Sequence, residues 1–426
     1  MSVIVVGGGM AGAACAAELA GDGIEVTLVD RHEYTQFQPL LYQVATSQLP
    51  ADNITRPLEE MFQRREEVTV VAGEIIGIDL DAKTVTTDAG TLGPADHLVI
   101  AAGSQPNFYG VPGAAEHSFP LYSVADAERL RIHLRDRLRE LSLPDSDGHL
   151  TVVICGGGPT GVETAGAIAE LFRALRDEDR LVGSATVRIV DRGRVLLGPF
   201  SDRSHVYAFD KLTQMGVAVS FGVAVTSVDA ASATLSDGST VSTDTVIWAG
   251  GISGASIVEL AGVAPGHGGR IDVAEDLTVP GYSDVFALGD VANVPDGAGG
   301  TLPQLGSVAL QSGAWAGRSI RALREGGEAR PFEYHDKGIM AMVGRNAAVA
   351  EIGRRRRHLE GALAFAAWLG LHASLLSGFH DRVDAVQNWV EDYINRDRAA
   401  DLELDEPGDR IMWADDPSEL PATPSP

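Results

Sequence analysis

Two glycine-rich loops, far apart in the chain, constrain this fold more than any other feature of the sequence. Residues 3–12 read VIVVGGGMAG, and residues 152–161 read VVICGGGPTG. Each loop follows an apolar, β-branched run and precedes an Ala-rich stretch, which predicts a strand, a tight turn and a helix. Either loop alone could be no more than a tight turn. Two loops in the same context predict an α/β protein with two Rossmann-like dinucleotide-binding domains.

The spacing of the glycines has a physical reason. Gly7 permits the tight turn, Gly9 lets the backbone approach a pyrophosphate, and Gly12 lets the helix pack close to the strand. The pyrophosphate then lies at a helix N-terminus, where free N–H groups and the helix dipole favour an anion. The second loop repeats the spacing with Gly156, Gly158 and Gly161.

An aspartate ends the strand that follows each loop. Residues 25–30 read EVTLVD and end in Asp30, whereas residues 186–191 read TVRIVD and end in Asp191. A carboxylate at this place accepts hydrogen bonds from ribose hydroxyls and repels a 2′-phosphate. We therefore expect a nucleotide without a 2′-phosphate at Asp191, although Arg192 and Arg194 could also turn toward a phosphate.

Composition excludes several classes of protein. The chain has 426 residues and a net charge of −26, which disfavours nucleic acid and anionic membrane surfaces as partners. Its two cysteines, Cys15 and Cys155, form no CxxC motif, so no local redox dithiol is predicted and both are expected to be small buried residues. No metal site is expected. The first residues already read as a core strand, so no secretory signal is predicted and we expect a cytoplasmic protein.

The order of the motifs predicts how the domains are arranged. Strands over 97–102 and 284–288, which precede Gly103 and Gly289–Asp290, are expected to belong to the first dinucleotide domain. A helix capped by Ser123 and Asp126 is expected to open the second, which ends with a strand over 245–248. The expected regions are the first domain in two parts (1–118 and 266–329), the second domain (119–265), a C-terminal region (330–398) and an acidic, disordered tail (399–426).

The sequence allows several roles for the C-terminal region. A hairpin is predicted over 340–352, and Arg354–Arg357 beside it form either a solvated turn or a membrane contact. The uncharged stretch 361–379 is interpreted as a buried or interfacial segment rather than a membrane span. Apolar residues between 379 and 393 follow helical spacing, which predicts an amphipathic helix. Such a helix packs on its own protein, on a second copy in a homodimer, or on lipid.

Several segments resemble one family closely. The doubled loop with Gly289–Asp290 resembles the pyridine nucleotide-disulfide oxidoreductase-like flavoproteins, and residues 37–46 (FQPLLYQVAT) resemble the type II NADH dehydrogenases, the single-subunit NADH:quinone oxidoreductases. Other similar segments are 160–166 (TGVETAG), 337–345 (KGIMAMVGR), 347–351 (AAVAE) and the stretch that carries Trp368, His372, Gly378 and Trp389. Together they cover the chain to about Arg398.

The resemblance implies both cofactors and the reaction. FAD would bind the first loop and NADH the second, with NADPH the less favoured donor. NADH would pass hydride to FAD N5, and two electrons would go on to a quinone without ion pumping. The residues implied for FAD are Gly7, Gly9, Gly12, Asp30, Gln43, Thr46, Ala101, Gly103, Gly289, Asp290 and Ala309. Those implied for NADH are Gly156, Gly158, Gly161, Asp191 and Gly250. The implied catalytic residues are Glu163 near the nicotinamide, and Lys337 and Gln311 at the acceptor pocket.

Two departures from the family pattern fall on the acceptor side. Family members start the quinone-site helix with two glutamines four residues apart, but here the positions hold Ser307 and Gln311, with Gln304 nearby. The terminal helix continues with acidic rather than basic residues, so we expect only weak peripheral contact with the cytoplasmic face of a membrane. Two alternatives stay open: a soluble FAD-dependent NAD(P)H reductase with a carrier protein or small oxidant as acceptor, and a flavoprotein that acts mainly as a redox-dependent interaction partner.

Overall fold

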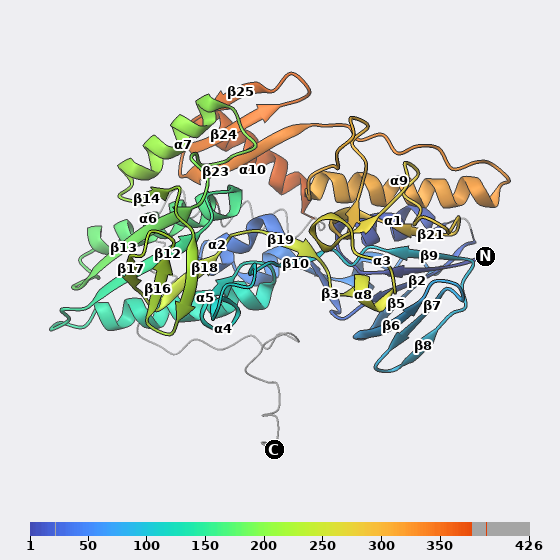
Figure 1. Ribbon diagram of the computed structural model, residues 1–426, viewed down its shortest axis with the longest axis horizontal. Coiled ribbons are helices and arrows are strands. Elements are labelled where there is room, and N and C mark those ends of the chain that lie inside the picture. Colours follow the sequence, from blue (N-terminus) through green and yellow to red (C-terminus); the bar gives the residue numbers. More distant parts are fainter. Residues whose placement is uncertain (22, 377–388, 390–426) are drawn as a thin grey trace, which may run out of the picture. The chain divides into compact units, whose positions relative to one another are not determined.

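In a computed structural model, which describes residues 1–21, 23–376 and 389, the chain forms two compact units. The first unit consists of Met1–Gln36, Thr55–Pro106 and Ile252–Asp336. The second unit consists of Phe37–Ile54, Asn107–Gly251 and the described residues from Lys337 onward. Each unit is built on a five-stranded parallel sheet (Figure 1). The predicted domain limits, which followed the expected nucleotides, remain a prediction.

The sheet of the first unit has the strand order β21-β9-β1-β2-β5. These strands are Val285–Ala287 (β21), His97–Ile100 (β9), Ser2–Val6 (β1), Glu25–Asp30 (β2) and Val68–Ala72 (β5). The β-branched residues of β1, β9 and β21 are buried on both faces, as expected for a parallel sheet covered by helices, whereas those of the edge strand β5 are half-buried or exposed. Helices α1 (Met10–Leu19) and α9 (Gly306–Arg324) pack against each other beside it (Figure 1).

Smaller elements complete the first unit. An antiparallel meander contains Ile75–Asp79 (β6), Thr84–Thr87 (β7) and Gly90–Leu92 (β8). Three short pairs are Tyr34–Gln36 (β3) with Thr55–Pro57 (β4), Ser104–Pro106 (β10) with Ile252–Gly254 (β19), and Ile271–Asp272 (β20) with Ala292–Asn293 (β22). The short helices are Leu58–Phe62 (α3), Ile257–Leu260 (α8), His267–Gly269 (η3) and Gly289–Val291 (η4).

The sheet of the second unit has the order β11-β18-β12-β13-β14 and is also parallel. Its strands are Phe119–Pro120 (β11), Thr245–Trp248 (β18), His149–Cys155 (β12), Ser184–Asp191 (β13) and Ala218–Phe221 (β14). Helices α5 (Val124–Leu141) and α6 (Pro159–Asp177) are its longest. The β12–α6 junction therefore repeats the β1–α1 junction of the first unit.

Further elements of the second unit surround this sheet. Two antiparallel sheets contain Val225–Asp229 (β15), Ser232–Leu235 (β16) and Thr240–Ser242 (β17), and Gly338–Gly344 (β23), Ala347–Ile352 (β24) and Arg357–Glu360 (β25). The remaining helices are Gln38–Leu40 (η1), Leu41–Ala45 (α2), Ala51–Ile54 (η2), Ala114–His117 (α4), Asp202–Gln214 (α7) and Ala362–Leu375 (α10).

The structure confirms the α/β fold and most of the predicted elements. The capping pair on α5 is present in both directions, since Ser123 Oγ accepts from the Asp126 N–H and the Asp126 carboxylate accepts from the Ser123 N–H. Strand β25 was not predicted, and it begins at the last of the four arginines. The predicted amphipathic helix over 379–393, apart from residue 389, and the acidic tail lie outside the described residues. Among the described residues, no helix has the length and apolar character needed to cross a bilayer.

Candidate dinucleotide-binding and redox site

The glycines of the first loop are required by close packing. Gly7 has φ +101°, and a Cβ on it would lie 2.4 Å from the Ala101 carbonyl oxygen. A Cβ on Gly12 would lie 1.8 Å from the Gly7 carbonyl oxygen, so α1 could not approach β1 with any larger residue there. Gly9, the N-cap of α1, has no atom within 4 Å of its Cβ position. Its open side leaves space for an anion at the helix N-terminus.

The second loop has the same geometry. Gly156 has φ +110° and would place a Cβ 2.3 Å from the Ala249 carbonyl oxygen. A Cβ on Gly161 would lie 1.9 Å from the Gly156 carbonyl oxygen, whereas the Cβ position of Gly158 is open. Gly250 lies close to the Trp248 indole, at the end of the neighbouring strand β18. The structure thus contains two matched glycine cradles, one in each unit. The first is formed by Gly7, Gly9 and Gly12, and the second by Gly156, Gly158 and Gly161.

Each aspartate lies against its own glycine loop. Asp30 Oδ2 accepts from the Gly8 N–H at 2.6 Å, and Asp191 Oδ2 accepts from the Gly157 N–H at 2.5 Å. Burial alone would raise the pKa of Asp30, but hydrogen bonds from His32 and Gly8 outweigh it and the net pKa is lowered. Asp30 is therefore an anion with oxygen lone pairs to offer a ribose.

Asp290 lies at the edge of the first cradle, directly after β21 and Gly289. Gly289 has φ +65°. A Cβ on it would lie 3.0 Å from the Ala11 Cβ on α1 and 3.4 Å from the Ala309 Cβ on α9, so the segment after β21 meets both helices there. Ser104 Oγ donates to Asp290 Oδ2 at 3.3 Å. Burial raises the pKa of Asp290, opposed in part by Ser104 and by the charge of Arg270. Gly103, with φ +72°, accepts from the Ala255 N–H.

The polar residues of α9 and of the segment just before it that were predicted at the acceptor pocket make contacts within the first unit. Ser307 Oγ lies 2.8 Å from Tyr334 Oη. The Gln311 side chain donates to the His335 carbonyl oxygen and accepts from the His335 N–H. Gln304 donates to the Asp290 carbonyl oxygen at 3.0 Å. Gln311 thereby holds the segment around His335 against the first turns of α9.

Glu163, on α6, occupies an enclosed polar niche of the second unit. Its Oε1 accepts from the Met342 N–H at 3.1 Å, and the Trp368 indole N–H also donates to the carboxylate. The residue keeps some exposed surface, but its carboxyl group is buried, and this burial raises its pKa to about 8. The two hydrogen bonds lower the pKa and offset only part of this effect. Glu163 is therefore mostly protonated at neutral pH.

A chain of contacts links the Glu163 niche to α2. The Tyr42 hydroxyl donates to Met342 Sδ at 3.3 Å, and Gln43 Nε2 donates to Tyr42 Oη at 3.0 Å. Trp389 Nε1 in turn donates to Gln43 Oε1 at 2.9 Å. Thr46 Oγ1 donates to the Tyr42 carbonyl oxygen and ends the helix. The structure thus brings predicted Gln43, Thr46 and Glu163 into one neighbourhood.

The aromatic side of this neighbourhood is formed by α10. The rings of Trp368 and His372 stack with centroids 3.8 Å apart, and Trp389 lies 6.2 Å from Trp368. His372 Nδ1 lies 2.8 Å from the Trp368 carbonyl oxygen. Burial lowers the pKa of His372 to about 4, so its imidazole is neutral at neutral pH. Lys337, by contrast, is exposed just before β23, and its carbonyl oxygen accepts from the Gly353 N–H.

Both cysteine thiols lie in the interior of the protein. Cys15 and Cys155 are buried and unpaired, and burial raises the pKa of each thiol to about 12, so both stay protonated. No cluster of three or more potential metal ligands exists in the part of the chain that the structure describes. The prediction that both cysteines are buried is confirmed.

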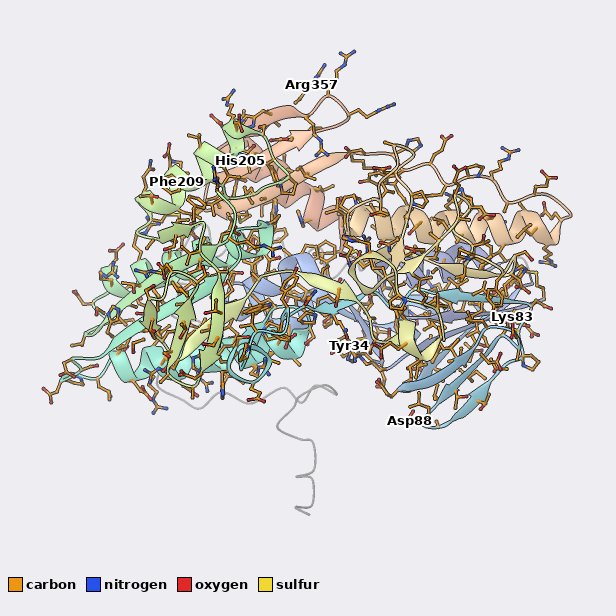
Figure 2. The ribbon with its side chains drawn as sticks, in the orientation of Figure 1. Tyr34, Lys83, Asp88, His205, Phe209 and Arg357 are labelled. Atoms are coloured by element: carbon orange, nitrogen blue, oxygen red, sulfur yellow. The ribbon has the colours of Figure 1, made fainter. Side chains whose placement is uncertain are left out.

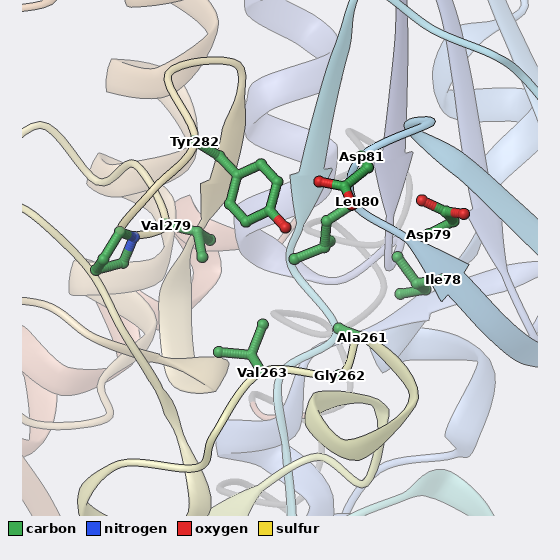
Figure 3. Close-up of a pocket in the computed structure, with 10 residues that line it drawn as sticks. Ile78, Asp79, Leu80, Asp81, Ala261, Gly262, Val263, Val279 and Tyr282 are labelled. Carbon is green, nitrogen blue, oxygen red and sulfur yellow. The ribbon is translucent and has the colours of Figure 1, made fainter.

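A separate hollow of about 420 Å³ opens on the first unit (Figure 3). It is lined by the end of β6, by residues near α8 and by the segment that carries Tyr282. The Tyr282 hydroxyl hydrogen-bonds to Asp81, which raises the pKa of the tyrosine. None of the residues predicted for either nucleotide lines this hollow, so it is distinct from both cradles.

Sequence reasoning missed three residues of the second unit. Tyr42 and Met342 connect Gln43 with Glu163, but their spacing in the sequence carries no sign of that contact. Tyr109 lies beside the second cradle, since a Cβ on Gly251 would come within 2.5 Å of Tyr109 Oη. The turn residues around it, Asn107 and Gly110, could have marked this position.

Comparison with known proteins places these features in one family. The family model described as pyridine nucleotide-disulphide oxidoreductase matches residues 1–313. The solved NDH2 of Plasmodium falciparum, in complex with NADH, has a TM-score of 0.82 over 92% of this chain and 98% of its own, at 16% identity. The sulfide:quinone oxidoreductase of Aquifex aeolicus has a TM-score of 0.74 over 92% and 95%, at 19% identity. These structures support the fold.

Relatives with closer sequences identify the branch of the family. A type II NADH:quinone oxidoreductase of Mycobacterium tuberculosis is 32% identical over 93% of this chain and 89% of its own length. A protein of the same name from Staphylococcus aureus is 27% identical over 82% of this chain and 89% of its own length. The chain therefore belongs to the pyridine nucleotide-disulphide oxidoreductase family and, within it, to the type II NADH:quinone oxidoreductases, which are oxidoreductase enzymes.

Proposed function

We propose that this protein is an FAD-dependent NADH:quinone oxidoreductase that moves no ions across a membrane. The observation that carries the proposal is the pair of matched glycine cradles, one in each unit, around Gly9 and Gly158. One cradle alone would suit many dehydrogenases. Two cradles allow one nucleotide to remain bound as a cofactor while a second one exchanges. The type II relatives, whose names specify NADH and quinone, support the same assignment.

The first cradle suits FAD. Its open glycine side, next to Gly9, would take the pyrophosphate, and the anionic Asp30 would accept hydrogen bonds from the ribose. Asp290 and Gly289 would hold the ribityl hydroxyls, and the α9 N-terminus at Ala309 would direct its positive dipole end toward the flavin ring. When bound, FAD would supply the redox chemistry, namely hydride acceptance from NADH and the transfer of two electrons to a quinone.

The second cradle would bind NADH, and Glu163 close by would hold a proton. Asp191 favours a nucleotide without a 2′-phosphate, so NADH is preferred over NADPH. Glu163 holds a proton at neutral pH in a niche shared with Trp368 and Met342, and it can serve the nicotinamide side. Lys337, which is exposed, and Gln311 are the residues that we propose for the reaction with the acceptor. We place the enzyme in the cytoplasm, in weak contact with the inner face of the membrane.

A second function is favoured by one observation on α9. Ser307 replaces the glutamine that the family has at the quinone site, and its hydroxyl contacts Tyr334. The amide of Gln311 is engaged by the His335 backbone. These contacts suit a reductase on the same scaffold whose acceptor is a carrier protein or a small oxidant.

Steady-state NADH oxidation with a panel of acceptors distinguishes the two functions. The panel consists of a short-chain ubiquinone, menadione, ferricyanide, cytochrome c and oxygen. We expect the quinones to give the highest kcat/KM, and the yellow protein to release FAD on heating. A preference for cytochrome c or ferricyanide over both quinones supports the second function, and a protein that takes up no FAD contradicts both.

The open glycines allow each cradle to be tested separately. Gly9→Ala and Gly158→Ala add a methyl group that meets no protein atom, so each variant should fold like the natural protein. We expect Gly9→Ala to lower the FAD content after purification. Gly158→Ala should keep its FAD and raise KM for NADH severalfold, because the methyl group intrudes on the pyrophosphate. Gly370→Ala, on α10 and equally open, is the matched control.

A further inference from the structure

Tyr109 has an unusual backbone and a large exposed ring. Its φ is +51°, in the left-handed region that non-glycine residues seldom adopt, and its side chain is 54% exposed. The Asn107 side chain accepts from the Tyr109 N–H at 2.8 Å and fixes this turn. A strained and exposed aromatic residue next to a ligand cradle needs a reason other than packing.

The turn is anchored to the end of β18. The Asn107 N–H donates to the Gly251 carbonyl oxygen at 3.0 Å, and the Trp248 indole donates to the Asn107 carbonyl oxygen at 2.8 Å. Phe108 packs on Trp248 with ring centroids 5.6 Å apart. Gly251, with φ +137°, leaves room for the Tyr109 hydroxyl, which a Cβ there would meet at 2.5 Å. These contacts fix the turn that carries Tyr109 against the end of β18.

The ring of Tyr109 engages Arg192 on its other side. The Arg192 Cζ lies 5.5 Å from the ring centroid, within the range of a cation–π contact. Arg192 directly follows Asp191 at the end of β13. In the sheet, β12 lies between β18 and β13, so the Tyr109–Arg192 contact joins the ends of the two strands that flank the strand leading into Gly156 and Gly158. The guanidinium is therefore drawn toward β18 and away from the outer side of Asp191.

This placement bears on the choice of nucleotide. A 2′-phosphate would lie beside the ribose at Asp191, and the arginine next in sequence is well placed to neutralise it. We propose that Tyr109 is a specificity-determining residue: by holding Arg192 over its ring, it denies a 2′-phosphate its cation and keeps the second cradle selective for NADH. The inference rests on the proposed role of this cradle as the NADH site.

The test compares four variants in two assays on the FAD-loaded protein. The first assay is the ratio of kcat/KM for NADPH to that for NADH. The second is the Kd of 2′,5′-ADP relative to that of 5′-AMP, measured by calorimetry without turnover. Tyr109→Leu should raise the NADPH ratio and tighten 2′,5′-ADP binding by about two- to fivefold, the factor that an exposed cation–π contact provides. Tyr109→Phe keeps the ring face and should keep both ratios near the natural values.

Two further variants control the result. Tyr109→Leu combined with Arg192→Ala should lose the gain, because the freed guanidinium is gone. Tyr207→Leu removes another ring under a cation, Lys211 at 5.8 Å on α7, and should leave both ratios unchanged. If Tyr109→Leu leaves both ratios at the natural value, or if the gain survives loss of Arg192, the inference is wrong. If the natural protein binds no 5′-AMP or prefers NADPH, the proposed NADH site itself is wrong.

Discussion

Glu163 has surroundings that favour its uncharged form. Burial raises its pKa to about 8, whereas an unfolded chain gives it a value near 4.5. Between these values the unfolded state releases the proton and the folded state keeps it. The stability that this carboxyl contributes is therefore complete below about pH 4.5 and is lost as the pH rises through about 8. Both of its hydrogen bonds come from donors, and an amide oxygen can accept them as well.

We predict that Glu163→Gln gains stability over the natural protein as the pH rises. From about pH 5 to about pH 9, the difference in unfolding free energy should grow by on the order of 3 kcal/mol. The measurement is Tm by calorimetry across this range. Glu170→Gln, on the same helix, is the matched control, since Glu170 also accepts a backbone N–H, from Arg345. A pH slope no steeper than that of Glu170→Gln would contradict the pKa assigned to Glu163.

Individual residues differ in how far the sequence could place them. The glycines and the strand-end aspartates follow from local rules, because one loop contains its own turn, helix N-terminus and packing contact. The resemblance pointed to Gln43 and Glu163, but their link through Tyr42 and Met342 joins residues distant in the chain. No local pattern encodes such a contact. The same reason hid the pairing of Tyr109 with Arg192.

Helices α1 and α9 contact each other through small residues. A Cβ on Gly313 would lie 2.1 Å from the Ala11 carbonyl oxygen, and one on Gly317 would lie 2.9 Å from the Cys15 carbonyl oxygen. Both obstacles are backbone atoms, so no side-chain rotation relieves them. This packing fixes the N-terminus of α9, with Ala309, against Gly289.

We predict that Gly313→Ala destabilises the first unit despite adding a single methyl group. The helices must separate, at a cost of about 1–3 kcal/mol or more, which should lower Tm by several degrees and reduce FAD content. Gly370→Ala makes the same change in α10, where no atom lies within 4 Å. It should be neutral or stabilising, because alanine favours a helix over glycine. Equal effects of the two substitutions in calorimetry would show that the α1–α9 contact tolerates separation.

Helices and strands could be predicted where their own residues form a local sequence pattern. Strand β2 and strand β18 occupy the residues that the sequence indicated, because each is a buried β-branched run that ends at a turn. Strand β25 reads RHLE, a charged sequence that pairs with β24 only because the hairpin brings it there. Its pairing is accompanied by contacts such as that of Glu360 with Arg203 on α7.

Charge and apolar surface oppose each other in any contact of this protein with a membrane. The chain carries a net charge of −26, although Arg354–Arg357 form a local basic cluster at the turn before β25 and at its first residue, Arg357, which projects outward (Figure 2). Helix α10 exposes Leu363 to 75%, with Leu371 and Leu375 also exposed. Such side chains can enter a lipid interface whatever the charge of its headgroups.

We predict weak vesicle binding that is insensitive to salt. In flotation assays, neutral vesicles should bind the protein at least as well as anionic ones, with no loss of binding between about 50 mM and about 500 mM salt. Leu363→Ser should reduce binding, whereas Val206→Ser, at an exposed valine on α7, should not. Binding restricted to anionic vesicles and abolished by salt would contradict this view and assign the membrane contact to Arg354–Arg357. A change from dimer to monomer in Leu363→Ser would instead assign the leucines to a second copy of the chain.

The alternation of the two units along the chain has a consequence for synthesis on the ribosome. Strand β1 emerges first, but β21, which closes the same sheet, follows only after every strand of the second unit's parallel sheet. Helix α9 is translated later still. The small-residue face of α1, which packs against α9, therefore stays exposed while more than half of the chain is translated. The first unit therefore cannot fold to completion before α9 has been translated, and its early apolar surfaces stay exposed to aggregation until then.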